Sequence, residues 1–585
     1  MPIKVLATEV IDRIAAGEVV ERPAAVVKEL VENSLDAGAT RIIVETRGGG
    51  IGLIQVADNG IGIPPAELEL AFQRHATSKI SSANDLESIS SLGFRGEALP
   101  SIAAVAEVEV TSSTGETEGG TYVVMREGVV AGHGLRGRSR GTTVTVRNLF
   151  RNVPARLKFL KSTATENSHI AQVVSQYALA YPEIMFSLAV DERSVLSTTG
   201  NGKLLDAVLS VYGLDTARGM LEIKREGKWG EEKAGAIVVS GLAGTPQISR
   251  TSRDYLSFFV NRRWINSRLL LRAVEDAYHG MLTVGKHPVV VLNIELPARD
   301  IDVNIHPAKS EIKFQNERAV FGAVQKAVRG TLAGLTPVPL MEQPAAVYTP
   351  VPPLPTWLPQ PKPDFGPRPI STPDEHISAA PSSQPTPMFA LPALRLLGQL
   401  ASTYIIAEGP DGLYLIDQHA AHERILFERV ERQRAQRGVE VQGFLEPAVF
   451  EATPRQSALL KVQHPESSVP LSEYLAGFGF DLEPFGNNTY LIRAAPAGLD
   501  VKGCLAAIRE LLDSTSEGKS WTERIAESIA CHGAVKAGQI LSDSEMRELV
   551  RELEQTSTPH TCPHGRPTMI HLGLNQLEKD FKRVQ

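Results

Sequence analysis

Apolar residues recur at helical spacing near the start of the chain and in short strand-like runs after it. After Pro23, which a helix tolerates in its first turn, apolar side chains stand three or four apart at Val26, Val27, Leu30, Val31 and Leu35. Short apolar runs predict strands at residues 41–46, 51–57, 108–111, 122–125 and 142–146, with a turn at Gly48-Gly49-Gly50 between the first two. The mixture predicts a sheet covered by helices.

The same kind of pattern continues in two later regions. Residues 255–260 and 289–294 predict strands of a second unit, and residues 403–407 and 413–416 predict a hairpin around Gly409-Pro410-Asp411-Gly412. Between them, 17 of the 38 prolines fall from Pro337 to Pro392, and such a segment buries too little apolar surface to fold. We therefore expect an α+β multidomain protein with units at 1–204 and 205–335, a disordered Pro-rich linker at 336–390 and a C-terminal domain at 391–585.

Composition narrows the class of protein. The 585 residues suit three or four domains, and 42% hydrophobic residues suit packed cores. Three cysteines, no secretory pattern at the N-terminus and no apolar run near 20 residues predict a reduced, cytoplasmic protein without a membrane partner. The formal charge of −7 argues against a uniformly basic nucleic-acid surface but leaves room for local basic patches.

Two polar motifs suggest a nucleotide site. Glu29 and Asn33 are four residues apart on the first predicted helix, where a carboxylate can act as a general base and an amide oxygen can ligate Mg²⁺. Asp58 ends a strand before Gly60 and Gly62, where an aspartate can accept a hydrogen bond from an exocyclic amine while glycines permit close backbone approach. The alternatives are a solvated helix face and an ordinary turn.

A third motif suits an anion. The run Gly93-Phe94-Arg95-Gly96-Glu97 precedes a predicted helix, and a Gly-x-x-Gly turn at that position presents backbone N–H groups to phosphates. Thr77, Ser78 and Lys79 come shortly before it.

The C-terminal domain carries three segments rich in metal ligands. Asp417, His419, Glu423 and Glu428 fall within twelve residues; we expect Asp417 and His419 to project from one side of a strand end, with Glu428 supporting the site. Further ligands follow in Ala530-Cys531-His532 and Cys562-Pro563-His564, and Cys-x-His suits Zn²⁺. The alternative is that the cysteines are small buried hydrophobes.

Together these motifs resemble those of the GHKL ATPase superfamily, through Glu29/Asn33, Asp58–Gly62, Gly93–Leu99 and Gly141-Thr142-Thr143. The amino-acid sequences of residues 93–99, 148–160 and 302–309 are more specific motifs and resemble those of the MutL family of DNA mismatch-repair proteins. The resemblance extends over nearly the whole chain apart from the linker. The resemblance implies a Bergerat-type ATPase α/β sandwich, a second α/β subdomain with a ribosomal-protein-like fold, and an α+β C-terminal dimerisation and endonuclease domain.

The resemblance also implies roles in ATP hydrolysis. Glu29 activates water, Asn33 holds Mg²⁺, Asp58 reads the adenine amine, and Lys309 reaches the γ-phosphate from the second subdomain. The remaining nucleotide contacts come from Gly60, Gly62, Thr77, Ser78, Lys79, Gly93, Phe94, Arg95, Gly96, Glu97 and Thr143.

In the C-terminal domain, residues 417–428 fit the Asp-Gln-His-Ala-x-x-Glu-x-x-x-x-Glu motif of endonuclease-type MutL proteins, and Phe581-Lys582-Arg583 also resembles that class. This implies nicking of duplex DNA with Zn²⁺ and/or Mn²⁺, with Asp417 and Glu423 catalytic. The metal candidates are Asp417, His419, Glu423, Cys531, Cys562 and His564, and Lys536 and Arg566 are candidates for phosphate contacts.

Partners follow from the same resemblance. We expect a homodimer, a MutS-type mismatch sensor, and sequence-independent DNA contact through Arg268. Composition alone also offers basic residues clustered at 136–161 and 262–268 as phosphate contacts, with a solvated charged face as the alternative. A peptide for the replication sliding clamp is expected at Gln442, Phe444, Leu445 and Pro447. Two rival hypotheses remain: a non-cutting ATP-dependent matchmaker with a structural metal site, and another GHKL machine such as a topoisomerase subunit or chaperone.

Overall fold

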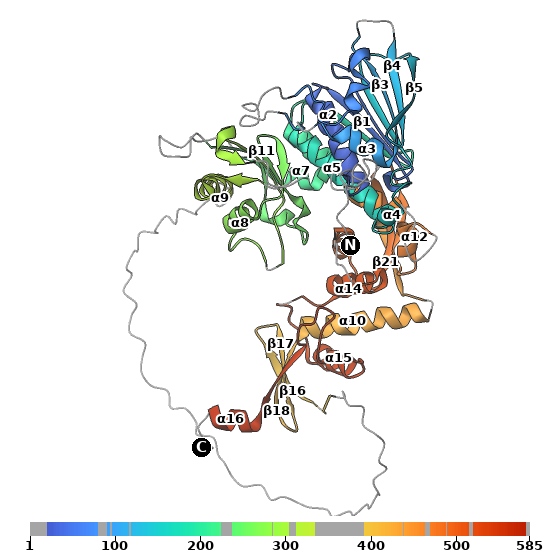
Figure 1. The fold of residues 1–585 in the computed structure, drawn as a ribbon. Helices are drawn as coiled ribbons and strands as arrows, with labels where there is room; N and C mark the ends of the chain where they lie inside the picture. Colours follow the sequence, from blue (N-terminus) through green and yellow to red (C-terminus); the bar gives the residue numbers. More distant parts are fainter. Residues whose placement is uncertain are drawn as a thin grey trace, which may run out of the picture.

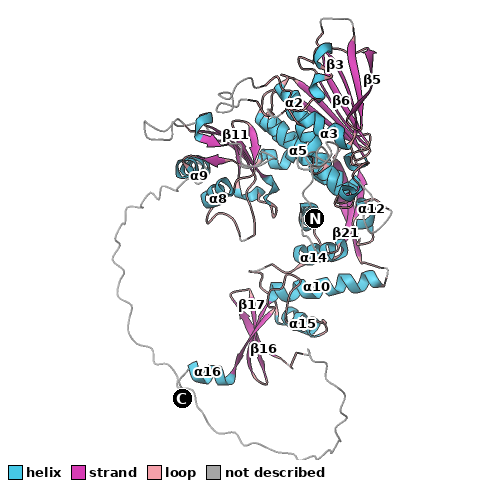
Figure 2. Cartoon of the chain, viewed as in Figure 1, coloured by secondary structure: helices cyan, strands magenta, loops and turns pink. Residues whose placement is uncertain are grey.

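The computed structural model of the chain shows several α/β units (Figures 1 and 2). It describes residues 20–79, 91–93, 96–115, 119–223, 237–283, 285–302, 312–333, 391–392, 394–436, 438–461, 469–486, 488–513, 519–536 and 538–580. The expected linker and the motif residues Phe94, Arg95, Lys309 and 581–583 lie outside these ranges. Within the described ranges, no helix combines the length and apolar character that crossing a membrane requires.

An eight-stranded sheet frames the N-terminal unit, in the order β5-β4-β3-β6-β2-β1-β7-β8, and β1 with β7 is its parallel pair. The strands predicted at 41–46, 51–57, 108–111, 122–125 and 142–146 are all confirmed within it. The strands are β1 (Arg41–Arg47), β2 (Leu53–Asp58), β3 (Glu107–Ser113), β4 (Gly120–Arg126), β5 (Val129–Arg136), β6 (Gly141–Arg147), β7 (Met185–Val190) and β8 (Arg193–Ser197).

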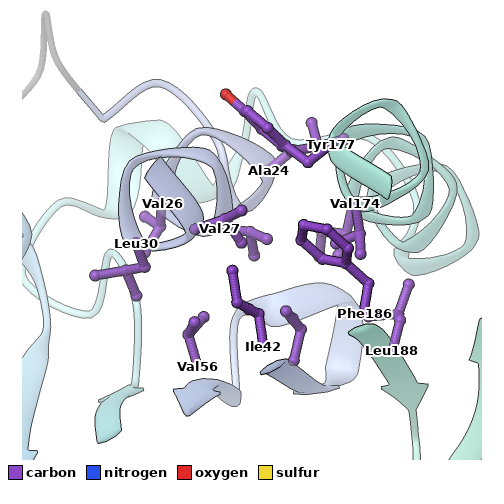
Figure 3. Packing of buried hydrophobic residues seen from close by; sticks show 14 of the residues in the cluster. Ala24, Val26, Val27, Leu30, Ile42, Val56, Val174, Tyr177, Phe186 and Leu188 are labelled. Atoms are coloured by element: carbon purple, nitrogen blue, oxygen red, sulfur yellow. The ribbon is translucent and has the colours of Figure 1, made fainter. Parts of the chain in front are cut away.

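Helices α2 (Pro23–Asp36) and α5 (Thr163–Ala180) pack side by side over this sheet (Figure 3), and α3 (Ala98–Val105) packs on β3 and β4. The predicted apolar stripe of α2 is confirmed, because Val26, Val27, Leu30 and Val31 are buried against strand residues such as Ile42. Ser162 caps α5 by accepting a hydrogen bond from Thr165 N. Because the apolar side of α2 faces the sheet, its polar side can contact other segments of the chain.

The second unit is a five-stranded sheet in the order β12-β11-β13-β10-β9. Its alternating residues face two different cores. Phe258 and Leu292 pack with α8 (Arg268–Ala277) and α9 (Glu317–Ala333), whereas Phe259 and Val291 join the core of the first unit together with α6 (Leu204–Tyr212) and α7 (Leu214–Arg218). The strands are β9 (Met220–Ile223), β10 (Val238–Gly244), β11 (Leu256–Val260), β12 (Arg263–Ile265) and β13 (Val290–Glu295).

The C-terminal region contains two smaller sheets. A four-stranded antiparallel sheet has the order β16-β17-β18-β22, and α10 (Gln418–Ala435) and α15 (Asp543–Glu554) pack beside it. It consists of β16 (Arg395–Leu400), β17 (Tyr404–Gly409), β18 (Gly412–Asp417) and β22 (Met569–Gly573), and α16 (Leu574–Asp580) follows β22. The predicted hairpin at 403–416 is confirmed as β17 and β18.

The other C-terminal sheet has the order β19-β21-β20 and shares a core with several short helices. One of these helices, α11, packs against α5 of the N-terminal unit, and Ala458 belongs to the N-terminal core. The elements are β19 (Val441–Glu451), β20 (Asp481–Pro484), β21 (Thr489–Pro496), α11 (Pro454–Lys461), α12 (Leu471–Ala476), α13 (Val501–Asp513) and α14 (Trp521–Gly533).

Candidate nucleotide site and candidate metal centre

The polar side of α2 is bonded to the segment before the Gly93 turn. Asn33 Oδ1 accepts a hydrogen bond from Lys79 Nζ at 2.8 Å, and the same ammonium lies 2.5 Å from Asp36 Oδ2. Asp36 also accepts hydrogen bonds from the backbone N–H groups of Leu92 (2.9 Å) and Gly93 (3.1 Å). Sequence reasoning missed Asp36, although its place three residues after Asn33 on one helix was a usable signal.

Asp58 joins three elements of the first unit. Its Oδ1 accepts from Gly60 N at 2.8 Å and Thr142 N at 3.2 Å, and its Oδ2 accepts from Ser34 Oγ at 3.0 Å. Ser34 lies on α2, Asp58 ends β2 and Thr142 belongs to β6. These hydrogen bonds hold the Asp58 carboxylate in place between α2, β2 and β6.

The glycines around Asp58 are required by the chain's own backbone. Gly62 has φ 78°, and a Cβ there would lie 2.2 Å from Ser113 O. Gly141 has φ 124°, and a Cβ there would lie 2.1 Å from Asp58 O. Ligand approach, the reason expected from sequence, is therefore not needed to explain Gly62.

The Arg138 side chain forms hydrogen bonds within this site and is not part of an exposed basic surface. Its guanidinium donates to Asp58 O at 3.0 Å and Gly141 O at 3.1 Å, and also to Thr143 Oγ1. Burial lowers the pKa of Arg138, and the Asp58 carboxylate works in the opposite direction. Arg138 was grouped with DNA-contact candidates, and the structure corrects that assignment.

The arginines of the other predicted basic cluster, 262–268, also differ in their exposure and their partners. Arg263 is buried and donates hydrogen bonds to Ser91 O (3.0 Å) and Leu92 O (3.2 Å). Its side chain is therefore not exposed for contact with DNA. Arg262 pairs with Glu183 at 2.6 Å. Arg268 is exposed at the first residue of α8.

The residues expected to contact the nucleotide phosphates, 77–79 and 93–97, would form a lid over the nucleotide, and part of this lid lies within the described residues. Thr77 Oγ1 accepts from Lys79 N at 3.2 Å, and His75 N donates to Gly96 O at 3.2 Å. His75 Nδ1 also lies 3.6 Å from a Glu97 carboxylate oxygen. Segment 75–79 is thus joined to residues 96–97, while Ser78 is exposed and Glu29 lies half-buried one turn before Asn33 on α2.

Asp417 begins the candidate metal centre as a helix cap. Its Oδ1 accepts from His419 N at 2.9 Å and Ala420 N at 3.0 Å, because β18 ends at Asp417 and α10 begins at Gln418. The expectation that Asp417 and His419 project from one side of a strand is therefore wrong. His419 and Glu423 are instead one turn apart on α10.

Pairing of β18 with β22 brings the distant Cys562 segment to α10. Asp417 N donates to Thr568 O at 2.9 Å, and a tight turn is closed by Cys562 N donating to Arg566 O at 2.8 Å. As a result, ligand atoms of Glu423, Cys562 and His564 all lie within 4.8 Å of one another. The sequence suggested these three residues, and the fold places them together.

Glu423 lies at the centre of this group and is fully buried. Its Oε2 is 2.9 Å from Arg566 Nη2 and 3.5 Å from His564 Nδ1. Its Oε1 is 3.2 Å from His419 Nε2 yet has no aligned hydrogen-bond partner within the described part of the chain. A buried carboxylate oxygen facing thiol and imidazole donors fits a Zn²⁺-type ion.

The charges in the group reinforce one another. Burial raises the pKa of Glu423, but His419 and His564 together outweigh it and leave that pKa well below its ordinary range. Glu423 in turn raises the pKa values of His419 and His564. The group is therefore a cluster of mutually stabilised charges in which protons and a cation compete for one position.

The Val535 peptide orients two histidines of α10. His419 Nδ1 lies 2.9 Å from Val535 O, which leaves Nε2 facing Glu423, and Val535 N donates to His422 Nδ1 at 3.0 Å. Burial lowers the pKa of His422 to about 4, so this ring is neutral. A carbonyl on the far ring nitrogen is the usual support for a metal-binding imidazole.

Other predicted ligands lie around rather than within the group of three. Asp417 acts as the cap, and Cys531 lies on α14 with its pKa raised to about 12 by burial, with Glu423 and Glu510 adding to the effect. Glu428 accepts from Ser557 N at 2.8 Å and from Ser557 Oγ at 2.7 Å, so it anchors the loop that leads to Cys562. Lys536 is exposed beyond the end of α14.

The expected clamp-binding peptide lies on β19, where pairing with β21 is interrupted between Gly443 and Ala448. Leu445 is fully exposed, whereas Phe444 packs against the core of this sheet. Gln442 and Pro447 are exposed. The motif therefore presents Leu445 rather than its aromatic residue.

Family models match three parts of the chain. Residues 21–133 match the histidine kinase-, DNA gyrase B- and HSP90-like ATPase, residues 208–333 the C-terminal domain of a DNA mismatch repair protein, and residues 397–541 the MutL C-terminal dimerisation domain. "DNA mismatch repair protein MutL" of Desulforudis audaxviator is 40% identical over 99% of both chains. The protein with the same description from Symbiobacterium thermophilum is 39% identical over 99% of this chain and all of its own.

Among solved structures, the Aquifex aeolicus MutL ATPase domain complexed with ADP is 30% identical, covers 48% of this chain and 93% of its own, and has a TM-score of 0.36. The fold and the family models define the class of protein: a GHKL-type ATPase unit followed by a C-terminal dimerisation domain. Since full-length relatives match at about 40% identity, the chain belongs to the MutL family of DNA mismatch-repair proteins.

Proposed function

We propose that this chain is an endonuclease-type MutL protein, an ATP-driven switch that couples mismatch recognition to strand nicking by its own C-terminal domain. The observation that supports nicking most directly is the group that the buried Glu423 carboxylate forms with Cys562 and His564, whose ligand atoms all lie within 4.8 Å of one another. Carboxylate, thiolate and imidazole groups are ligands that bind a divalent cation.

Glu423, Cys562 and His564 would hold the ion, with His419 Nε2 adjacent. A divalent ion bound there supplies an activated water and neutralises charge on the scissile phosphate. Arg566, now paired with Glu423, becomes free to bind a DNA phosphate when that carboxylate is engaged. Asp417 uses Oδ1 for the cap, and we assign Oδ2 to the reacting water or to a second ion.

Nicking of supercoiled plasmid with Mn²⁺ tests this proposal. Glu423→Gln and Asp417→Asn should lower the nicking rate by at least about 100-fold, because each removes a charge from the reacting group. Glu431→Gln is the matched control, since Glu431 lies on the same helix outside the group. Equal nicking by all four proteins contradicts the proposal.

The rival function is a non-cutting ATP-dependent matchmaker with a structural metal. The cysteine and imidazole ligands favour it as a second candidate, because such ligands are typical of structural Zn²⁺ sites. Zinc content and nicking separate the two functions. A protein that contains zinc, loses it in Cys562→Ser and does not nick DNA with Mn²⁺ is the matchmaker.

For the ATPase, we propose Glu29 as the base that activates water, Asn33 as the Mg²⁺ ligand and Asp58 as the adenine-reading group, with Lys309 and the lid residues on the phosphates. The fixed Asp58 carboxylate supports this assignment. Glu29→Ala should retain nucleotide binding and lose at least about 100-fold in turnover. Unchanged turnover removes Glu29 as the base.

We propose homodimerisation through the four-stranded C-terminal sheet. Large apolar side chains are exposed on this sheet at Leu397, Leu400, Tyr404 and Ile570, and at Leu574 at the start of the adjoining α16, which suits an interface between two copies. Arg268 is the proposed DNA contact of the second unit, Leu445 the proposed clamp contact, and a MutS-type sensor the proposed upstream partner. Loss of the dimer in Leu400→Glu with Tyr404→Glu, measured by analytical ultracentrifugation, tests the sheet as the interface.

A further inference from the structure

The C-terminal domain contacts the N-terminal units through a small set of polar side chains. Asp513 ends α13, and both of its oxygens accept from Tyr255 Oη, at 2.9 and 3.1 Å. Gln456 Nε2 donates to Asp513 Oδ1 at 2.7 Å. All three side chains are buried.

Further polar contacts surround this group. Arg455 pairs with Asp254, and its Nε donates to Ser168 Oγ on α5 at 3.1 Å. At the edges, Leu214 N donates to Glu451 Oε2 at 2.8 Å and Asn488 Nδ2 donates to Val195 O at 2.6 Å. Each contact joins residues on opposite sides of the linker.

Apolar and aromatic side chains also take part in the interface. Ala458 of α11 joins the N-terminal core, and Tyr212 and Tyr255 lie with ring centroids 5.2 Å apart. Two buried atoms nearby, His169 Nε2 and Asn488 Oδ1, have no hydrogen-bond partner in the described chain. Polar contacts and unsatisfied groups between domains are typical of domains that separate and rejoin.

We propose that α5 and the Tyr255 edge of the second unit form a docking surface for the chain's own C-terminal domain. The C-terminal side of the contact is made by Arg455, Gln456 and Asp513. We name these three residues with Ser168, Asp254 and Tyr255 the interdomain latch. The chain between the described residues 333 and 391 is long enough to allow docking within one copy.

The latch is connected to the candidate metal centre by two helices. Asp513 ends α13, and α13 packs on α14, where Ser528 Oγ donates to Ala507 O at 2.9 Å. Cys531 lies near the end of α14. The docked surface therefore reaches, through α13, the helix that carries Cys531 beside the candidate metal centre, whether or not that centre cuts DNA.

Hydrogen–deuterium exchange on the full-length chain tests the latch through a charge swap. Arg455→Glu and Asp254→Arg should each raise exchange in peptides over 251–260 and 452–461 by at least about tenfold, because each leaves an unpaired charge at the contact. The double variant restores the pair in reverse and should regain most of the protection. Additive loss in the double variant overturns the proposal.

Three controls keep the result interpretable. Arg493→Glu breaks an exposed pair within the C-terminal domain, at 2.7 Å from Glu483, and should leave both peptides unchanged. Tyr255→Phe removes one hydroxyl without adding a charge and should raise exchange less than Arg455→Glu. Protection that depends on protein concentration places the docking surface between two copies and overturns the assignment to a single chain.

Discussion

Lys79 Nζ donates a hydrogen bond to Asn33 Oδ1 across 2.8 Å, so an ammonium group occupies the amide oxygen that the family resemblance assigns to Mg²⁺. Asp36 holds the same ammonium at 2.5 Å. If Asn33 binds Mg²⁺ as we propose, the ion must displace this lysine. The Mg²⁺ requirement of the proposed nucleotide site would then depend on Lys79.

Replacing Lys79 with methionine should lower the Mg²⁺ concentration required for nucleotide binding. Loss of the competing positive charge favours the metal ion by about 1 kcal/mol, or about fivefold, for a pair this close to solvent. The measurement is a Mg²⁺ titration of fluorescent ATP-analogue binding. Lys28→Met is the control, since Lys28 lies on α2 beside Glu32, and an unchanged requirement in Lys79→Met contradicts the competition.

Metal binding at Glu423 should strengthen as pH rises. His419 and His564 have raised pKa values because of Glu423, so each holds its proton above the ordinary value near 6.5 until the ion displaces it. Zinc affinity measured with a chromophoric chelator should rise between about pH 6 and 8. Affinity independent of pH over that range contradicts a site containing these imidazoles.

The metal-free protein should show the opposite trend in stability. The charge pairing of His419 and His564 with Glu423 is fully present below pH 6.5 and is lost as pH rises through the raised histidine pKa values. Glu423 has a lowered pKa, so its share is present above its ordinary value of about 4.5 and is lost on further acidification. Chemical denaturation with a chelator present should therefore place the maximum contribution between about pH 4.5 and 6.5.

The protonation of Asp513 should favour the docked state of the interdomain latch as pH falls. Burial raises the pKa of Asp513 to about 6, against the opposing effects of Tyr255, Gln456, Arg250 and Arg455. A raised pKa means that Asp513 takes up a proton on docking and contributes up to about tenfold for each pH decrease of one between about 6 and 4, whereas burial lowers the pKa of His169 to about 4 and that group opposes docking over the same range. Exchange protection of 452–461 should therefore fall more steeply with decreasing pH in Asp513→Asn than in the unaltered protein, and identical pH profiles remove Asp513 as a contributor.

The β19 peptide offers a matched pair of substitutions. Leu445 is fully exposed, so Leu445→Asp should abolish clamp binding without changing the midpoint of thermal unfolding. Phe444 packs against the domain core, so Phe444→Ala should cost about 2 kcal/mol of stability. Surface plasmon resonance on immobilised clamp, with thermal unfolding alongside, measures both. Clamp binding that survives Leu445→Asp rejects this peptide as the contact.

Local patterns predicted the elements better than the contacts between them. The apolar spacing of α2 and the hairpin of β17 and β18 could be derived from neighbouring residues, because burial on one face sets the period. Asp417 was misplaced because its side chain caps α10, and a carboxylate at a strand end and one at a helix start look alike in sequence. Glu428, expected to support the site, holds the loop before Cys562.

Contacts between residues far apart in the sequence could not be predicted from such local patterns. Arg263 and Arg138 stand in basic runs that are typical of surfaces, yet their partners are carbonyl groups far along the chain. Asp513 and Tyr255 are 258 residues apart, and neither has a neighbour that signals the other. Their contact arises only from how complete units pack, which no local spacing encodes.

The pairing of β18 with β22 sets an order for biosynthesis. Glu423 leaves the ribosome well before Cys562 and His564, which lie shortly before β22 in the chain. A nascent chain that ends before residue 562 contains the nucleotide motifs and Glu423 but neither Cys562 nor His564. The order of synthesis therefore leaves the proposed cutting site without two of its three donors until the rest of the protein has been made.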